Sequence, residues 1–132
     1  MKIDRVLETC LYADDLAAAE RFYSRVLGLE IFARAENRHV FFRCGAQMFL
    51  IFRPSGTRES NSVPAHGATG PGHVAFAVDS GDLDAWRRRL VEAGVPLEQE
   101  KTWPSGAQSL YFRDPADNSV ELTVAALWDL PG

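Results

Sequence analysis

The sequence predicts an α+β fold built from two βαβββ units, each an open mixed sheet with one helix. Three observations lead to this prediction. Short runs alternate between apolar and other residues as half-buried strands do, two longer stretches have helical spacing, and both halves of the chain repeat the same order of elements. A single open sheet leaves one face uncovered, so we expect the two units to pair as repeats, with mixed sheets that curl around a concave surface.

The first predicted unit covers residues 5–53. The stretch "VLETCLYA" alternates as a strand does, and "DDLAAAERFYSRVLGL" follows with helical spacing. Asp14 or Asp15 is the expected N-cap, and Gly28 is a plausible end of the helix. Three further strands are expected at Glu30–Ala33, His39–Arg43 and Gln47–Phe52.

The second predicted unit covers residues 72–125 and repeats this order. A helix with an aspartate cap is expected over 81–95, ending near Gly94. The linking segment, residues 54–71, is rich in Gly, Pro and Ser and long for a loop, which is typical of functional or mobile connections. Strands are expected at His73–Val78, Val95–Glu98, Ser109–Arg113 and Ser119–Val124.

Length and composition bound the classes of function. The 132 residues suffice for one domain, 1–132, and 46% hydrophobic with 24% charged residues is typical of a soluble globular protein. A net charge of −4 argues against a nucleic-acid partner. The two cysteines, Cys10 and Cys44, form no disulfide framework, so we expect reduced thiols in a cytoplasmic protein. No stretch has the length of a membrane span, and no membrane partner is expected.

Strand alternation directs three ionisable residues to the concave side. His73 shares its face with two alanines, Glu8 shares its face with Cys10, and Glu121 opposes the apolar positions of the last strand. A strand histidine is commonly structural, and a Glu–His contact is also an ordinary ion pair. The apolar residues on the opposite faces are Leu7, Leu11, Val74, Phe76, Val78, Val120, Leu122 and Val124.

Three segments resemble one known family. "YADDLAAAERFYSRVLGLEI", "GPGHVAFAV" and "LYFRDPADNSVEL" resemble the vicinal oxygen chelate superfamily, which includes glyoxalases, fosfomycin-resistance enzymes, extradiol dioxygenases and bleomycin-resistance proteins. The resemblance covers nearly the whole chain. It implies metal ligands on the first strand of each unit and on the closing strand, which are Glu8, His73 and Glu121 here. The implied cofactor is one divalent ion per site, Zn, Mn, Ni, Fe or Mg.

Two departures from the family pattern argue against particular reactions of the family. Classical glyoxalase I proteins carry a carboxylate at the position of Leu50, which cannot bind a metal, and this argues against methylglyoxal-type activity. Three protein ligands leave coordination positions for water or substrate, as in catalytic sites. Glu8 stands where many members carry His, which argues against a non-haem iron dioxygenase with two His and one carboxylate.

The other residues expected on the concave face are mostly apolar, which predicts a hollow that binds a small organic substrate. Arginines at strand ends either receive a substrate carboxylate or are simply exposed charges. The catalytic base implied by the resemblance is Glu121 or Glu8, and His66 is a loop residue for which gating or proton transfer stays open. The expected substrate-binding residues are Phe41, Arg43, Met48, Leu50, Phe52, Trp103, Tyr111 and Arg113.

We therefore expect a glyoxalase-like, metal-dependent lyase or isomerase in which the metal chelates substrate oxygens and stabilises an enolate or oxyanion. The alternative is a non-catalytic binder that sequesters a small molecule, as bleomycin-resistance proteins do. An extradiol dioxygenase or a fosfomycin-resistance-type transferase ranks below both. A homodimer is also expected, with sites that can take ligands from both subunits, because the tail residues Leu127, Trp128 and Leu130 have no element of their own to bury them.

Overall fold

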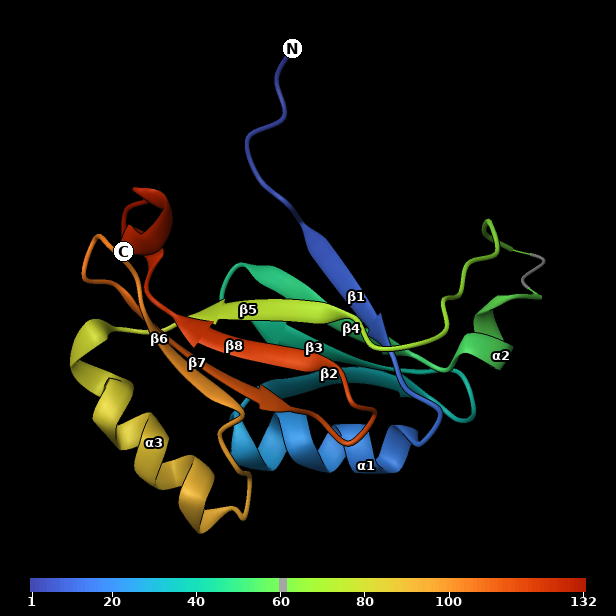
Figure 1. Ribbon diagram of the computed structural model, residues 1–132. Coiled ribbons are helices and arrows are strands. Elements are labelled where there is room, and N and C mark those ends of the chain that lie inside the picture. Colours follow the sequence, from blue (N-terminus) through green and yellow to red (C-terminus); the bar gives the residue numbers. More distant parts are fainter. Residues whose placement is uncertain (60–61) are drawn as a thin grey trace. The chain divides into compact units, whose positions relative to one another are not determined.

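Two compact units make up the computed structural model, which describes residues 1–59 and 62–132. The first unit is Met1–Pro71 and the second is Gly72–Gly132. Each contains one four-stranded mixed sheet and the chain has few helices, which confirms the predicted α+β class (Figure 1). The expected linking loop 54–71 includes residues 60–61, which lie outside the described residues. It also contains a short helix, α2, that the sequence pattern does not predict.

The first unit has its strands in the order β1-β4-β3-β2, with β1 parallel to β4 and the other pairs antiparallel. Helix α1 lies against one face of this sheet and continues into a π-type segment (Figure 1). The elements are β1 (Glu8–Tyr12), α1 (Leu16–Arg21), the π-type segment (Phe22–Val26), β2 (Glu30–Ala35), β3 (His39–Cys44), β4 (Gln47–Phe52) and α2 (Pro54–Thr57).

Local chemistry explains where the first helix begins and ends. The Oδ1 atom of Asp15 accepts a hydrogen bond from the backbone N–H of Ala18 at 3.0 Å, so Asp15 is the N-cap. The expected stop at Gly28 is present with φ of 75°, a backbone conformation that favours glycine. Between these ends the fully buried Tyr23 packs its ring on Phe49 of β4, with ring centroids 4.8 Å apart.

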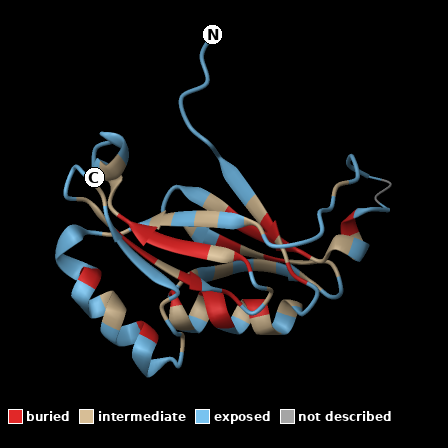
Figure 2. Cartoon of the chain, in the orientation of Figure 1, coloured by how far each residue is buried: buried red, intermediate tan, exposed pale blue. Residues whose placement is uncertain are grey.

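The second unit has the order β5-β8-β7-β6, with β5 parallel to β8 and the other pairs antiparallel. Buried residues run along β7 and β8, shown in red in Figure 2, and Leu90 of α3 is fully buried. The elements are β5 (His73–Ala77), a 3₁₀ turn (Ser80–Asp82), α3 (Leu83–Glu92), β6 (Gln99–Thr102), β7 (Gln108–Arg113), β8 (Ser119–Thr123) and a 3₁₀ turn (Ala125–Trp128).

Two expectations for this unit were wrong. No strand forms at 95–98, because the N–H of Val95 still bonds the helix carbonyl of Leu90 at 2.9 Å, and Pro96 has no N–H to donate. Strand β6 therefore starts at Gln99. Asp82 precedes α3 but its carboxylate accepts no bond from the first turn of the helix, since the preceding 3₁₀ turn gives it a helical backbone.

The two sheets have the same register, each within its own unit. In the first, Glu8 pairs with Met48 and Leu50 pairs with Phe41. In the second, His73 pairs with Ser119 and Glu121 pairs with Tyr111. Glu8 is thus the counterpart of His73, and Leu50 is the counterpart of Glu121, as the spacing of the sequence predicts.

The strand residues predicted to face the core are mostly the less exposed ones in the structure. Leu11, Val120 and Leu122 are buried, and Val74 and Phe76 are less exposed than the residues between them in β5. Leu7 is an exception at 57% exposed, because it lies before the first residue of β1 and is not part of the pleated strand.

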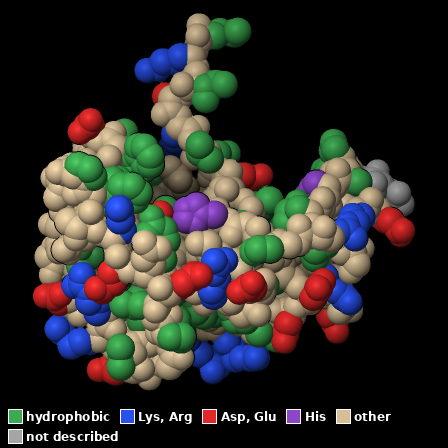
Figure 3. Space-filling model, viewed as in Figure 1, with side chains coloured by type: hydrophobic (Ala, Val, Ile, Leu, Met, Phe, Trp, Pro, Cys, Tyr) green, Lys and Arg blue, Asp and Glu red, His purple; other side chains and the backbone are tan. Residues whose placement is uncertain are grey.

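The surface carries mixed charge. Acidic and basic side chains are interspersed with hydrophobic ones on the face shown in Figure 3, in keeping with the small net charge of −4. Within residues 1–59 and 62–132, we find no helix that combines the length and apolarity needed to cross a bilayer. Cys10 and Cys44 are both half-buried free thiols.

Candidate functional site

The second unit brings two of the predicted ligands together. His73 opens β5, Glu121 lies in the middle of β8, and the His73 Nε2 atom is 3.4 Å from Glu121 Oε2. The His73 side chain is 52% exposed, whereas that of Glu121 is only 8% exposed. The other carboxylate oxygen, Oε1, is buried and has no hydrogen-bond partner among the described residues. A buried carboxylate with an unpartnered oxygen needs a compensating positive charge.

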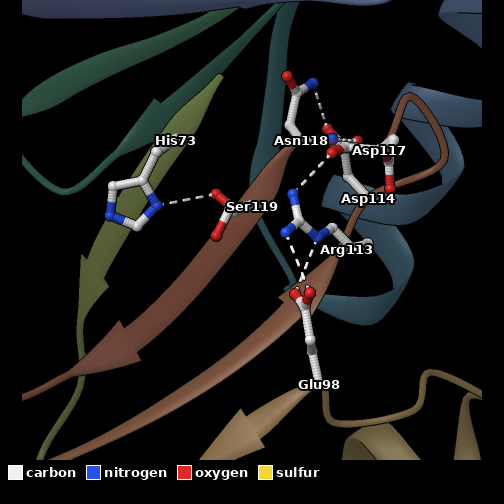
Figure 4. A network of polar contacts seen from close by, with 7 residues as sticks. All are labelled: His73, Glu98, Arg113, Asp114, Asp117, Asn118 and Ser119. Carbon is white, nitrogen blue, oxygen red and sulfur yellow. Dashed lines mark hydrogen bonds and ion pairs between the residues drawn. The ribbon is translucent and has the colours of Figure 1, made fainter. Parts of the chain in front are cut away.

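The orientation of the His73 ring fixes which nitrogen is available. Its Nδ1 atom lies 3.1 Å from the backbone carbonyl oxygen of Ser119, which only accepts hydrogen bonds, so Nδ1 carries a proton (Figure 4). In the neutral ring Nε2 then presents a lone pair towards Glu121. This is how metal-binding histidines are commonly held, with the second nitrogen donating to a carbonyl.

The turn between β7 and β8 sets the position of His73. Asn118 is almost fully buried, and its Oδ1 atom accepts a hydrogen bond at 2.8 Å from the N–H of Gly72, the residue before His73. Its Nδ2 group donates to Asp114 Oδ2 at 2.9 Å, and Asp114 Oδ1 accepts the N–H of Asn118 at 2.9 Å (Figure 4). The segment that carries the histidine is therefore tied to a closed turn.

Both candidate arginines have local partners. Arg113 forms an ion pair with Glu98 at 2.8 Å and donates to the carbonyl of Asp117 at 3.1 Å (Figure 4). Arg43 lies 3.6 Å from Glu30, and its guanidinium is 4.5 Å from the ring centroid of Phe32. A substrate carboxylate has to compete with these contacts, and Arg43 has the looser one.

Tyr111 and Trp103 lie in the same unit as His73 and Glu121. Tyr111 is opposite Glu121 in the β7–β8 ladder. Burial first, and then the charge of Glu121, raise the pKa of the Tyr111 hydroxyl, which therefore stays protonated. The Trp103 Nε1–H donates to Ser109 Oγ at 2.9 Å, which fixes the indole beside β7.

The first unit holds a hollow of about 290 Å³ that Glu8 helps to line. It contains two of the predicted substrate contacts, Leu50 and Phe52, and adds His66 and Tyr12. Their side chains are joined, with Tyr12 Oη 2.6 Å from His66 Nδ1. The lining residues are Glu8, Thr9, Cys10, Tyr12, Leu50, Phe52 and His66.

The other predicted contacts of this unit lie on β3 and β4. Phe41 packs on Phe52 with ring centroids 5.3 Å apart, and Met48 pairs with Glu8 in the ladder. A larger hollow of about 750 Å³ lies near the β2–β3 turn and the start of α1, lined largely by charged residues such as Glu36 and Arg53. We favour the smaller one as the site, because its lining is mainly apolar and aromatic with few polar groups.

Among the described residues, no three His, Cys, Asp or Glu side chains gather in a way that could hold a metal ion. The second unit brings His73 and Glu121 together as a pair, whereas Glu8 lies in the first unit. The pair suits a metal: donors sharing one divalent ion, each about 2.1 Å from it, stand roughly 3.0–3.4 Å apart. The observed separation is 3.4 Å.

Sequence reasoning missed two parts of these sites. Tyr12 was not among the candidate site residues, although its four-residue spacing from Glu8 in one strand directs both side chains the same way. The Asn118–Asp114 turn was visible as "RDPADNS", a cluster of turn-forming residues between two strands.

The comparisons with known proteins agree on the family. A family profile described as Glyoxalase/Bleomycin resistance protein/Dioxygenase superfamily matches residues 2–122. The crystal structure of a lactoylglutathione lyase from Agrobacterium tumefaciens is 42% identical, with a TM-score of 0.94. The match covers 98% of this chain and all of that one.

Curated relatives are more distant. The metallothiol transferase FosB of Bacillus licheniformis is 27% identical over 87% of this chain and 71% of its own length. The glutathione transferase FosA of Serratia marcescens is 29% identical over 89% of this chain and 78% of its own length. The Bacillus subtilis protein MhqE, which carries the name of a ring-cleaving dioxygenase, is 30% identical, and the chain spans only 40% of its length.

Proposed function

The chain belongs to the Glyoxalase/Bleomycin resistance protein/Dioxygenase superfamily, and on this premise we propose that it is a divalent-metal-dependent enzyme of glyoxalase type. The reaction class is that of a lyase or isomerase acting on a small organic substrate. The observation that carries the proposal is the His73–Glu121 pair, in which an oriented imidazole lone pair faces a buried carboxylate with one unpartnered oxygen.

His73, Glu121 and Glu8 are the residues we assign to the metal. His73 offers Nε2 and Glu121 offers Oε2, and Glu8 of the first unit is the counterpart of His73 in the repeat. Zn, Mn, Ni, Fe and Mg all accept this mixture of nitrogen and oxygen donors. When bound, such an ion supplies a Lewis acid that holds adjacent substrate oxygens and stabilises negative charge on them.

Glu121 is the carboxylate we assign as base. The resemblance to glyoxalases supports this role, in which a ligand glutamate takes a proton from a substrate carbon next to a carbonyl. Because the Glu121 Oε1 atom is buried and has no hydrogen-bond partner among the described residues, the side chain has to move to do so. Burial and the charge of Glu121 raise the pKa of the neighbouring Tyr111 hydroxyl, so it stays protonated beside this carboxylate. Glu8 is the second candidate base, since it lines the hollow of the first unit.

Apolar and aromatic side chains define the substrate as small and mostly apolar. Leu50, Phe52 and Phe41 form one wall in the first unit, with Met48 beside Glu8, and Trp103 is held beside β7 in the second. Arg43, whose contact with Glu30 is the longer one, is the better placed of the two arginines to receive a substrate carboxylate. Because a lactoylglutathione lyase is 42% identical, S-lactoylglutathione is one substrate to test, although Leu50 argues against methylglyoxal-type activity and the apolar lining favours a smaller, less polar molecule.

Metal analysis tests this proposal directly. We expect about one divalent ion per site in purified protein or after loading with Zn, Mn or Ni. His73→Ala and Glu121→Ala should each lower occupancy by tenfold or more without changing the far-UV circular dichroism. His39→Gln and Glu98→Gln are matched controls in ordinary packing and surface positions, and should keep full occupancy. Full occupancy in both His73→Ala and Glu121→Ala would refute the assigned ligands.

A non-catalytic binding protein is the second candidate, favoured by the apolar Leu50 at the position matching Glu121. Protein that takes up no divalent ion, yet binds small aromatic ligands, would support this alternative and refute the enzyme. Thiol transfer, as in the names FosA and FosB, is distinguished by product analysis with glutathione.

A homodimer with shared sites belongs to the same proposal. Trp128 and Leu130 in the tail are 72% and 60% exposed, and a second copy of the chain would cover them. Light scattering should give twice the chain mass. Mixing His73→Ala with Glu8→Ala protein under subunit exchange should restore metal binding to part of the sample, whereas a monomer at all concentrations would refute the shared site.

A further inference from the structure

A tyrosine and a histidine with no assigned role share a short hydrogen bond in the first unit. Tyr12 Oη and His66 Nδ1 are 2.6 Å apart, and both residues line the hollow of about 290 Å³ that contains Glu8. Tyr12 comes from β1, four residues after Glu8 on the same face. His66 comes from the segment that follows α2, so the contact joins residues 54 positions apart in the chain.

The segment around His66 is held in place at several points. The His66 N–H donates to the carbonyl of Thr57 at 3.1 Å, and Thr57 is fully buried. Gly67 packs so closely that a Cβ there would lie 2.9 Å from the Arg58 side chain. Of the described residues 62–71, His66 alone is not exposed. The histidine is therefore fixed in the hollow by its surroundings.

Aromatic packing fixes the orientation of both rings. The His66 ring meets Phe52 edge-on, with centroids 4.7 Å apart and an angle of 84°, and it lies 5.8 Å from the Tyr12 ring. Tyr12 is in turn 6.4 Å from Phe52. With both rings held, Nδ1 is committed to the tyrosine, and Nε2 is the nitrogen left to exchange protons with other groups.

We propose that Tyr12 and His66 form an acid–base relay that delivers a proton to a negatively charged substrate oxygen in this hollow. The inference rests on the proposed function, because it supplies the proton that an enolate or alkoxide product requires. It assigns the hollow to the oxygen-bearing end of the substrate.

The proton balance of the step is simple. In the charged form, His66 Nδ1–H donates to Tyr12 Oη, and the Tyr12 hydroxyl faces the substrate. The Tyr12 O–H bond breaks as a substrate O–H bond forms, and the Nδ1 proton moves to Oη and restores the phenol. His66 is left neutral with its proton on Nε2, and it regains a proton from solvent. No oxidant or reductant is needed.

The groups around the pair keep the tyrosine protonated. Burial, and then the nearby Cys10, raise the pKa of the Tyr12 hydroxyl, so the phenol acts as an acid and not as a phenolate. Other titratable or charged groups near the pair are Glu8 on β1 and two groups near the Phe52 ring. These are His39 on β3, whose ring centroid is 5.9 Å from that of Phe52, and Arg38, whose guanidinium carbon is 5.6 Å from the Phe52 centroid.

Kinetics of metal-loaded protein with S-lactoylglutathione or the hemithioacetal of methylglyoxal provides the first test. Tyr12→Phe keeps the ring and removes the proton, and we expect about a 10²-fold loss in kcat with little change in KM or metal content. His66→Gln should remove the basic limb from the pH profile of kcat. His39→Gln, the matched histidine control, should keep the wild-type profile. Unchanged kcat in Tyr12→Phe would overturn the relay while leaving the proposed function intact.

Histidine ¹⁵N spectroscopy gives a readout that needs no turnover. At high pH the wild-type His66 should carry its proton on Nε2, because Nδ1 accepts from Tyr12, and in Tyr12→Phe the Nδ1–H form should increase. The proposed function would be refuted separately, by the metal analysis, and the spectrum decides on the pair even where these substrates are not turned over. The same mixture of proton positions in wild type and Tyr12→Phe would overturn the relay.

Discussion

Asn118→Ala tests how the β7–β8 turn positions the histidine of the second unit. The substitution removes two side-chain hydrogen bonds of Asn118 that the structure shows. In the first, Asn118 Oδ1 accepts from the N–H of Gly72 at 2.8 Å, and in the second, Asn118 Nδ2 donates to Asp114 Oδ2 at 2.9 Å. Because Asn118 is 1% exposed, water cannot replace these partners without opening the turn.

The expected loss of stability follows from these two bonds. A neutral hydrogen bond contributes about 1 kcal/mol, and one to a charged group contributes about 1.5–3 kcal/mol. Together they predict that Asn118→Ala lowers the free energy of unfolding by about 2–4 kcal/mol. With a urea dependence of about 2 kcal/mol per molar, the unfolding midpoint should fall by about 1–2 M. Metal affinity should fall as well, because Gly72 directly precedes His73.

Urea unfolding followed by circular dichroism measures this effect. Ser105→Ala is the matched control, since the exposed Ser105 Oγ accepts only a long bond of 3.3 Å from the Ala107 N–H in a turn. That variant should stay within about 0.5 kcal/mol of wild type. An Asn118→Ala midpoint within about 0.3 M of the wild-type value would show that the turn is held by other contacts, and the reasoning would be wrong.

Two further predictions concern the first unit. Burial first, and then Arg38, lower the pKa of His39 below its ordinary value of 6.5, so the folded state binds fewer protons than the unfolded state. The stability of the protein should therefore decrease as the pH falls below about 6.5. Thermal unfolding at several pH values should show a smaller loss of stability in His39→Gln. An equal loss in wild type and His39→Gln would contradict the assignment of this pH dependence to His39. Leu50→Glu should destabilise the metal-free protein, because the Leu50 position is only 6% exposed and a carboxylate there is costly to bury. The same variant should raise the metal affinity about tenfold or more. The expected readout is a larger metal-induced rise in Tm than in wild type or in the control Leu50→Met. Unchanged affinity would refute the match between Leu50 and the ligand position of Glu121.

The fold was largely predictable because its strongest determinants are local. Apolar alternation located β1, β3, β4, β5, β7 and β8 to within two residues at each end, and Asp15 and Gly28 bounded the first helix. The strand expected at 95–98 failed for a local reason as well: the apolar Val95 next to Pro96 resembles a strand start, but the end of α3 uses its N–H. Helix α2 was missed because four residues are too few for periodicity to be detected.

The candidate site was predictable only where strand parity decides. Parity places Glu8, Tyr12, His73 and Glu121 on defined faces, and the ladders agree with that placement. The contact between Tyr12 and His66 was not predictable, because it depends on the path of a segment without periodic structure. The local ion pairs of Arg43 and Arg113 were equally hidden, since side-chain pairing between neighbouring strands is not visible in either strand alone.

The shared register of the two sheets makes their chemical differences informative. Where the second unit has His73 and Glu121, the first has Glu8 and Leu50 at the matching ladder positions. A symmetric four-ligand set is therefore impossible for this chain, because one of the four positions is an apolar residue that is 6% exposed. The first unit instead carries Tyr12 and His66, which can move a proton, beside that apolar position. Under the proposed function the two units therefore differ in kind: the second would provide donors to a metal, and the first would provide the space and the acid that a substrate needs.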